Sequence, residues 1–189
     1  HWLGKVRSDT AFVDLIFNSG NGVCAVDDSW FDRAGDAELF GQVVRVVSAE
    51  ESIWTKAFVM ERERYDGADV AHLLLACGRR LDWEHLRERF GPHWRVLLGC
   101  LTLFGYIYPG ESHLVPVWLL DELSGRLYQE THAPPQTTRV CAGTLLSREQ
   151  FLDDVQRLGF QDARLTSASS MTADEIEHWT RAIGQPHDL

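Results

Sequence analysis

The sequence predicts an α+β protein with its strands near the N-terminus and its helices in the middle and at the end. Residues 1–47 are rich in strand-forming residues, and the runs TAFVDLIFN (10–18) and QVVRVV (42–47) are strand candidates. From Ser48 onward, apolar residues recur at helical spacing. At 189 residues, the chain is long enough for one hydrophobic core and a smaller appended unit.

The first strand candidate, 10–18, carries one charge that needs an explanation. The run is apolar enough to be buried on both faces, and NSGNG (18–22) after it supplies turn residues suited to positive φ. Asp14 is the only charged residue in AFVDLIF, and a lone carboxylate there needs a partner. It either reaches solvent or a nearby Arg from the strand edge, or it binds a metal ion. Mg²⁺ commonly takes one or two carboxylates together with substrate phosphates.

Helix-start signals organise the rest of the chain. Three Ser or Thr residues with a Glu or Gln three positions later predict capping boxes, and Asp82 is a predicted N-cap. The boxes are Ser48 with Glu51, Ser147 with Gln150 and Thr172 with Glu175. We expect helices over 48–65, 69–77, 82–90, 93–106 and 116–129. The prolines of THAPPQTT (131–138) mark a linker, because proline breaks a helix.

These signals divide the chain into three parts. The first, 1–65, is β-rich and ends with the first helix. The second, 66–130, is a helical domain, and the third, 131–189, consists of the linker and a small helical tail.

Composition excludes several classes of function. The net charge of −10 argues against a protein that binds bulk DNA or an anionic membrane through a basic surface. No apolar run is long enough to span a membrane. The four cysteines form no Cys-x-x-Cys pair, so we expect reduced thiols and a cytoplasmic location.

Several charged residues fall on apolar helix faces. On a helical wheel over 48–65, Glu61 and Arg64 lie inside the apolar stripe, and Lys56 lies at its edge. Asp69 lies on the apolar face of the next helix, and Asp66 does too if that helix starts early. Buried charges are costly unless they are paired. These residues therefore form either an internal ion-pair cluster with helix caps or the lining of a functional cleft.

The same residues carry a family resemblance. The segments VDLIFNSGNGVCAVDDSWF, AEESIWTKAFVMERERYDGADVAHLL and LDWEHLRERFGPHWRVLLGCLTLFGYIYP resemble bacterial proteins of a nucleotidyltransferase family, within the polymerase-β-like superfamily. More remotely, the middle segment is similar to the toxin-type nucleotidyltransferases of abortive-infection systems. Those carry a Lys, an Arg and an Asp-x-x-Asp element on consecutive helices. The matching positions here are Lys56, Arg62, Asp66 and Asp69.

The resemblance implies a fold and a chemistry. The fold would be the N-terminal remnant of a nucleotidyltransferase-type mixed sheet, followed by a helical bundle and a small helical tail. The activity would be transfer of a nucleoside monophosphate from an NTP to a protein, RNA or small-molecule acceptor, with Mg²⁺ or Mn²⁺. Asp14 would be a catalytic metal ligand. Lys56 and Asp69 would be catalytic, and Arg62, Arg64 and Asp66 would bind substrate.

One part of the family pattern is absent. The superfamily signature is a Gly-rich turn and a strand bearing Asp-x-Asp, placed before the carboxylate that Asp14 matches. Only residues 1–13 precede Asp14. Asp27 and Asp28 are adjacent, so in a strand they would point to opposite faces. We therefore expect an enzyme that lacks an N-terminal segment here. The alternative is a non-catalytic nucleotide- or partner-binding domain that has lost its metal site.

Overall fold

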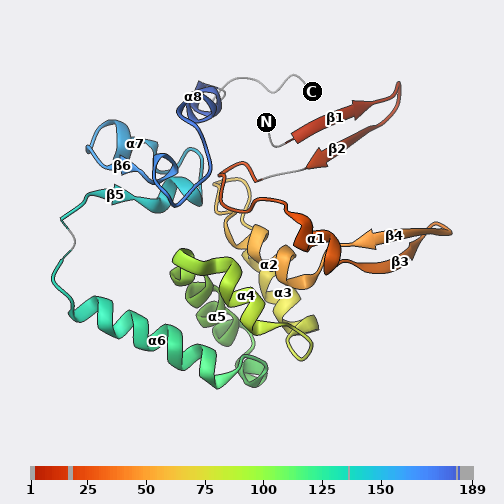
Figure 1. Ribbon diagram of the computed structural model, residues 1–189, viewed down its shortest axis with the longest axis horizontal. Helices are drawn as coiled ribbons and strands as arrows, with labels where there is room; N and C mark the ends of the chain where they lie inside the picture. The colour runs from red at the N-terminus through yellow and green to blue at the C-terminus, as the bar shows by residue number, and fades with distance from the viewer. Residues whose placement is uncertain (1–2, 17–18, 136, 182, 184–189) are drawn as a thin grey trace. The chain divides into compact units, whose positions relative to one another are not determined.

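The computed structural model describes residues 3–16, 19–135, 137–181 and 183, and it confirms the α+β class (Figure 1). Contacts between residues group the chain into two compact units. Unit 1 consists of residues 1–26, 61–63 and 137–189, and unit 2 consists of residues 27–60 and 64–136. The predicted boundaries at residues 65 and 130 stay a prediction. In the described residues, strands occur as three separate two-stranded pairs.

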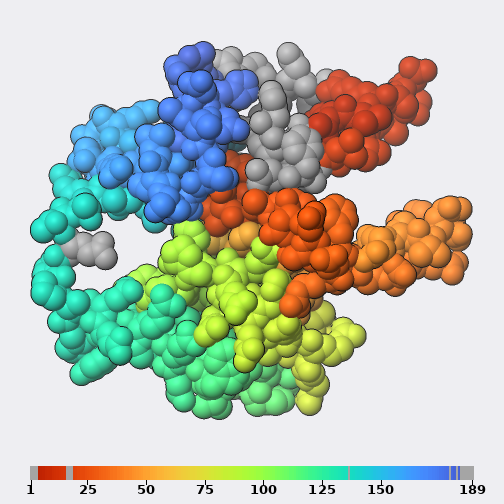
Figure 2. Space-filling view, in the orientation of Figure 1, coloured from red at the N-terminus to blue at the C-terminus, as the bar shows by residue number. Residues whose placement is uncertain are grey.

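Unit 2 is a helical bundle with one β-hairpin. Its elements are α1 (Asp28–Asp32), β3 (Gly35–Leu39), β4 (Gln42–Val46), α2 (Ala49–Ala57), α3 (Gly67–Cys77), α4 (Trp83–Phe90), the short 3₁₀ helices η1 (Gly91–His93) and η2 (Pro109–Leu114), α5 (Trp94–Ile107) and α6 (Val117–His132). Helix α2 packs on α3 and α4, and α5 packs on α3, α4 and α6. Figure 2 shows the β3–β4 hairpin, in orange, extending from the helices of this unit.

The core of unit 2 follows from helical spacing. On α5, Leu97, Leu101 and Phe104 recur at four- and three-residue intervals, and all three are buried. Ile53 of α2 and Leu123 of α6 are fully buried as well. Because these stripes face one another, the bundle buries a continuous apolar interior, which is the main favourable contribution to its stability.

Unit 1 joins an N-terminal hairpin to the C-terminal part of the chain. Its elements are β1 (Leu3–Arg7), β2 (Phe12–Ile16), β5 (Val140–Cys141), η3 (Ala142–Leu145), α7 (Leu152–Gln156), β6 (Gln161–Asp162), η4 (Ala163–Leu165) and α8 (Ala173–Arg181). Gly22 has φ +67° and lies so close to Met171 and Ser169 that a Cβ atom would collide with them. Asn21 Nδ2 donates to Leu145 O at 2.6 Å. These contacts hold the loop after β2 against the C-terminal residues.

A buried ion pair lies in the same unit. Arg164 donates to Asp162 at 2.7 Å, and both residues are buried. Burial raises the pKa of Asp162, but the hydrogen bonds from Arg164 and Thr144 and the charge of Arg164 together outweigh it and leave the pKa below its usual range.

Most of the predicted helix starts are confirmed. Ser48 accepts from the backbone N–H of Glu51, and Asp82 accepts from that of His85. Thr172 and Glu175 bond reciprocally, with Thr172 N 2.8 Å from Glu175 Oε2. These caps form as expected because each depends only on residues three apart.

Two expectations about the first helix and the first strand were wrong. The helix predicted over 48–65 ends at Ala57, and Met60 pairs with Tyr65 as an isolated β-bridge. The wheel therefore does not apply to Glu61 and Arg64. Strand β2 is buried on neither face, since its adjacent residues Phe12 and Val13, which point to opposite faces, are 63% and 58% exposed. Residues 17 and 18 of the predicted strand lie outside the described residues.

Candidate functional site

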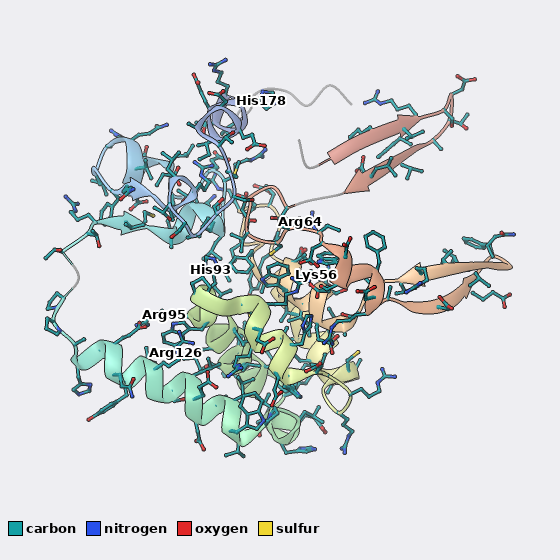
Figure 3. The ribbon with its side chains drawn as sticks, in the orientation of Figure 1. Lys56, Arg64, His93, Arg95, Arg126 and His178 are labelled. Carbon is teal, nitrogen blue, oxygen red and sulfur yellow. The ribbon has the colours of Figure 1, made fainter. Side chains whose placement is uncertain are left out.

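The structure brings four of the predicted site residues together at the ends of two helices. Lys56 lies in the last turn of α2, and Asp66 and Asp69 lie at the start of α3. These positions suit the charges, because a helix C-terminus favours a cation and an N-terminus favours an anion. Figure 3 shows Lys56 on α2 and Arg64 on the segment that follows it. All four residues belong to unit 2.

Asp66 is the buried anchor of this cluster. It occupies the N-cap position of α3, but its side chain makes no capping hydrogen bond. Arg64 instead binds it with two hydrogen bonds, Nε to Oδ1 at 3.0 Å and Nη2 to Oδ2 at 2.8 Å. The hydrogen bond from Arg64 lowers the pKa of Asp66 although burial opposes it. Asp66 therefore stays ionised while almost completely buried, at 8% exposure.

Lys56 connects the buried carboxylate to an exposed one. Its Nζ atom lies 3.4 Å from Asp66 Oδ2 and 2.6 Å from Asp69 Oδ2. The hydrogen bond to Asp69 raises the pKa of Lys56, so the ammonium stays protonated. The side chain of Asp69 is 54% exposed, against 9% for Asp66. Lys56 thus has one fixed counter-ion and one that solvent reaches.

The exposed side of the cluster is the Lys56–Asp69 ion pair. The two cations of the cluster, Lys56 and Arg64, balance its two carboxylates, so an anion must compete with Asp69 for the Lys56 ammonium. An ion pair that is open to water contributes little stability, roughly 0–1 kcal/mol, so such an exchange costs little. A phosphate group offers Lys56 the same charge-assisted hydrogen bond.

The other predicted site residues lie elsewhere. Asp14 is in unit 1, on β2, where its cross-strand neighbour Lys5 lies 3.7 Å away. Arg62 is exposed and forms no ion pair among the described residues. Glu61 accepts from Ser147 Oγ at 2.6 Å and from the backbone N–H of Arg148 at 2.8 Å, all within unit 1. Glu61 therefore caps the chain after η3, a role that a helical wheel cannot predict.

No ready-made metal centre accompanies the cluster. Across the described ranges, no group of three or more His, Cys, Asp or Glu side chains is arranged to hold a metal ion. Asp14 supplies one carboxylate, so substrate phosphates and water would have to complete the coordination of Mg²⁺ there. No helix in the described part of the chain is both long and apolar enough to cross a membrane.

Comparison with known proteins adds no family. No protein-family model, curated protein or solved structure matches this chain. The interpretation of the cluster therefore depends on its own geometry.

Unit 2 contains a second charged network, which was not predicted from the sequence. The carboxylate of Glu51 is fully buried and accepts from His85 Nε2 at 2.7 Å and from Arg89 Nε at 2.8 Å. Arg89 also binds Asp27 with two hydrogen bonds, at 2.7 and 2.8 Å. Its guanidinium stacks on Trp54, 4.9 Å from the ring centre. The network ties α1, α2 and α4 together.

Arg89 uses four of its five N–H donors within this network, two to Asp27, one to Glu51 and one to Ser29. Hydrogen bonds to Asp27 and Glu51 raise the pKa of Arg89, and the bond from Arg89 lowers that of Asp27. An open depression of about 500 Å³ lies beside Arg89, lined by Asp27, Asp28, Ser29, His85, Glu88 and Arg89.

One sequence signal could have predicted the buried network around Glu51. Glu51 precedes Trp54 and Phe58 by three and seven residues, which places it on their apolar stripe.

Proposed function

We propose that this chain acts in metal-dependent nucleotidyl transfer and that Lys56 binds the phosphates of the NTP. The observation that carries the proposal is the double contact of Lys56, with buried Asp66 on one side and exposed Asp69 on the other. Asp66 and Arg64 fix the position of the ammonium. An incoming phosphate takes the place of Asp69, and Lys56 keeps Asp66 as its permanent counter-ion.

The reaction needs a group that accepts a proton when the acceptor hydroxyl attacks. In the transfer, the acceptor oxygen bonds to the α-phosphorus, the bond from that phosphorus to the pyrophosphate oxygen breaks, and the hydroxyl proton must leave. Asp69, displaced from Lys56 by the phosphate, is an exposed carboxylate at the start of α3 and serves as the base. The resemblance assigns Arg62 to substrate binding; it is exposed and belongs to unit 1.

The metal and the fold remain parts of the same proposal. Mg²⁺ or Mn²⁺ would stabilise negative charge on the phosphates, and Asp14 is the one carboxylate here that the resemblance assigns to it. The resemblance likewise makes β1 and β2 the remnant of the mixed sheet. The acceptor is a protein, an RNA or a small molecule, and the acidic charge of the chain supports neither bulk DNA nor a membrane as partner.

The test is transfer of label from α-³²P-NTPs, with pyrophosphate release measured in parallel in Mg²⁺ or Mn²⁺. Lys56→Met and Asp69→Asn should each lower turnover by about 10²-fold or more. Arg157→Ala removes an exposed ion pair with Asp153 and should leave turnover unchanged. Turnover that survives Lys56→Met, Asp69→Asn and Asp14→Ala contradicts the proposal.

A binding domain is the second candidate, favoured by the incomplete ligand set around Asp14. In that case the protein binds NTP, measured by calorimetry, and Lys56→Met weakens binding, but no pyrophosphate is released with either metal.

A further inference from the structure

The β3–β4 hairpin exposes several apolar side chains that take no part in the proposed site. Phe40 at its tip is 96% exposed, Val43 is 77% exposed and Leu39 is 54% exposed. The hairpin forms a two-stranded sheet of its own in the described part of the chain, so both of its outer edges lack a strand partner there. An isolated hairpin has marginal stability in water, and unpaired edges readily bind another strand.

The register of the hairpin identifies the backbone groups on each edge. Phe40 and Gly41, with φ of 52° and 74°, form the two-residue turn. The pair that flanks such a turn, Leu39 and Gln42, exchanges both backbone hydrogen bonds, and every second pair does the same. The intervening residues therefore direct their N–H and C=O groups outward. These are Val43 and Arg45 on β4, and Asp36 and Glu38 on β3.

The two edges differ in their capacity to pair with a second copy. Consider two antiparallel copies of β3 centred on Ala37. Asp36 of each copy would stand opposite Glu38 of the other, and like charges directly opposite one another are destabilising. Two antiparallel copies of β4 centred on Val44 place Val43 opposite Arg45, and Val44 opposite Val44. No like charges stand directly opposite one another, and Val43 contacts the aliphatic part of Arg45.

The positive charge of Arg45 already has partners within its own copy of the chain. It donates to Ala34 O at 2.9 Å and lies 3.3 Å from Asp36 Oδ1. Pairing of β4 with a second β4 therefore buries no isolated charge. The side chains of Asp36, Glu38, Val43 and Arg45 lie on one face of the hairpin. The other face carries only uncharged residues: Gly35, Ala37, Leu39, Gln42, Val44 and Val46.

We propose that two copies of the chain associate through the outer edge of β4 and form a four-stranded antiparallel sheet. The two-fold axis passes between the two Val44 residues, which gives the self-complementary contact of a symmetric dimer. The outward N–H and C=O groups of Val43 and Arg45 form the new hydrogen bonds. The edge of β3 remains outside, where Asp36 and Glu38 prevent further strand addition.

The experiment is sedimentation velocity of the full chain across a dilution series. The wild-type protein should reach twice the chain mass of 21.5 kDa. Val44→Glu places two carboxylates at the two-fold axis and should raise the dimer dissociation constant by about tenfold or more. Ala37→Glu is the matched control: it introduces the same side chain opposite Val44 on β3, away from the axis, and should leave the dimer intact.

A charge-reversal mixture separates a broken interface from a damaged hairpin. Val44→Glu and Val44→Lys should each dimerise more weakly than the wild type when alone and form a mixed dimer when combined, because opposite charges then face each other. Recovery of the dimer in the mixture supports the proposal. It is overturned by a wild-type protein that stays monomeric at every concentration. It is equally overturned by a dimer that Val44→Glu and Ala37→Glu weaken to the same extent, or by a mixture that stays monomeric.

Discussion

Arg64 holds Asp66 in a two-hydrogen-bond ion pair although only Tyr65 separates the two residues in the chain. The pair closes the loop between α2 and α3, and the backbone N–H of Asp66 donates to Val59 O at 3.2 Å across the same loop. The orientation of Lys56 therefore depends on a local structure whose centre is the carboxylate of Asp66.

Asp66→Asn should destabilise the protein near neutral pH. The change removes the charge that Arg64 and Lys56 share, and hydrogen bonds to charged groups contribute roughly 1.5–3 kcal/mol. We expect the free energy of unfolding, measured in urea at pH 7, to fall by about 1–3 kcal/mol. Asp69→Asn, which removes the more exposed partner of Lys56, should change it by no more than about 1 kcal/mol.

The effect of Asp66→Asn should depend on pH with a definite sign. The pKa of Asp66 is lower in the folded than in the unfolded protein, so its ionised form favours folding. This contribution is complete above the unfolded pKa of about 4 and is lost as the pH falls further. The wild-type and Asp66→Asn unfolding curves should therefore converge as the pH is lowered below about 4. A difference that persists undiminished in acid contradicts the assignment.

Glu51→Leu should be among the most destabilising single changes in unit 2. It leaves Arg89 and His85 without the buried carboxylate oxygen that both contact. Breaking a buried ion pair from one side typically costs 3–5 kcal/mol. We expect a loss of about 3 kcal/mol in urea unfolding, since Arg89 retains Asp27. Glu84→Leu changes an exposed residue of α4 and is the control.

The local signals predicted the caps and the helical bundle well, because they depend on neighbours in the chain. Ser48, Asp82 and Thr172 start or cap helices as expected. The end of α2 at Ala57 could not be predicted, because AFVMERERY contains no Gly or Pro to stop a helix. The residues that follow α2 include one with a partner far along the chain, since Glu61 bonds to Ser147, 86 residues away.

The candidate site was predictable in part for the same reason. The helical wheel and the family resemblance drew attention to Lys56, Asp66 and Asp69, which the structure does place together. The pairing of Arg64 with Asp66 was not predicted. The helical wheel placed Arg64 on the first helix, but that helix, α2, ends at Ala57. The pairing of Arg89 with Asp27 spans 62 residues and has no local signature.

Replacement of two glycines by alanine should give opposite results. Gly99 lies within α5 with nothing near the position of a Cβ atom, so Gly99→Ala should stabilise the protein by about 0.5–1 kcal/mol. A Cβ atom on Gly143 would lie 2.3 Å from the ring of Phe151. Gly143→Ala should therefore destabilise the protein by roughly 1–3 kcal/mol. Equal shifts in the two urea midpoints would be inconsistent with these environments.

The buried pair of Asp162 and Arg164 offers a double-mutant cycle in unit 1. Arg164→Met alone leaves an uncompensated buried carboxylate and should cost about 3–5 kcal/mol. Asp162→Leu with Arg164→Met removes both charges and should cost less than the sum of the single changes. Additive single and double changes, measured by urea unfolding, would show that the two charges do not interact.

The division of the chain into units that are not continuous in sequence determines the order in which they can form during translation. Unit 2 has all its residues once position 136 has been synthesised, whereas unit 1 needs residues 137–189 as well as 1–26. The helical bundle can therefore fold while the ribosome is still at work, since domains generally fold as units and the earlier ones fold first. The loop around Gly22 must wait for Ser169, Ser170 and Met171, because its hydrogen-bond partners lie 148 residues later in the chain.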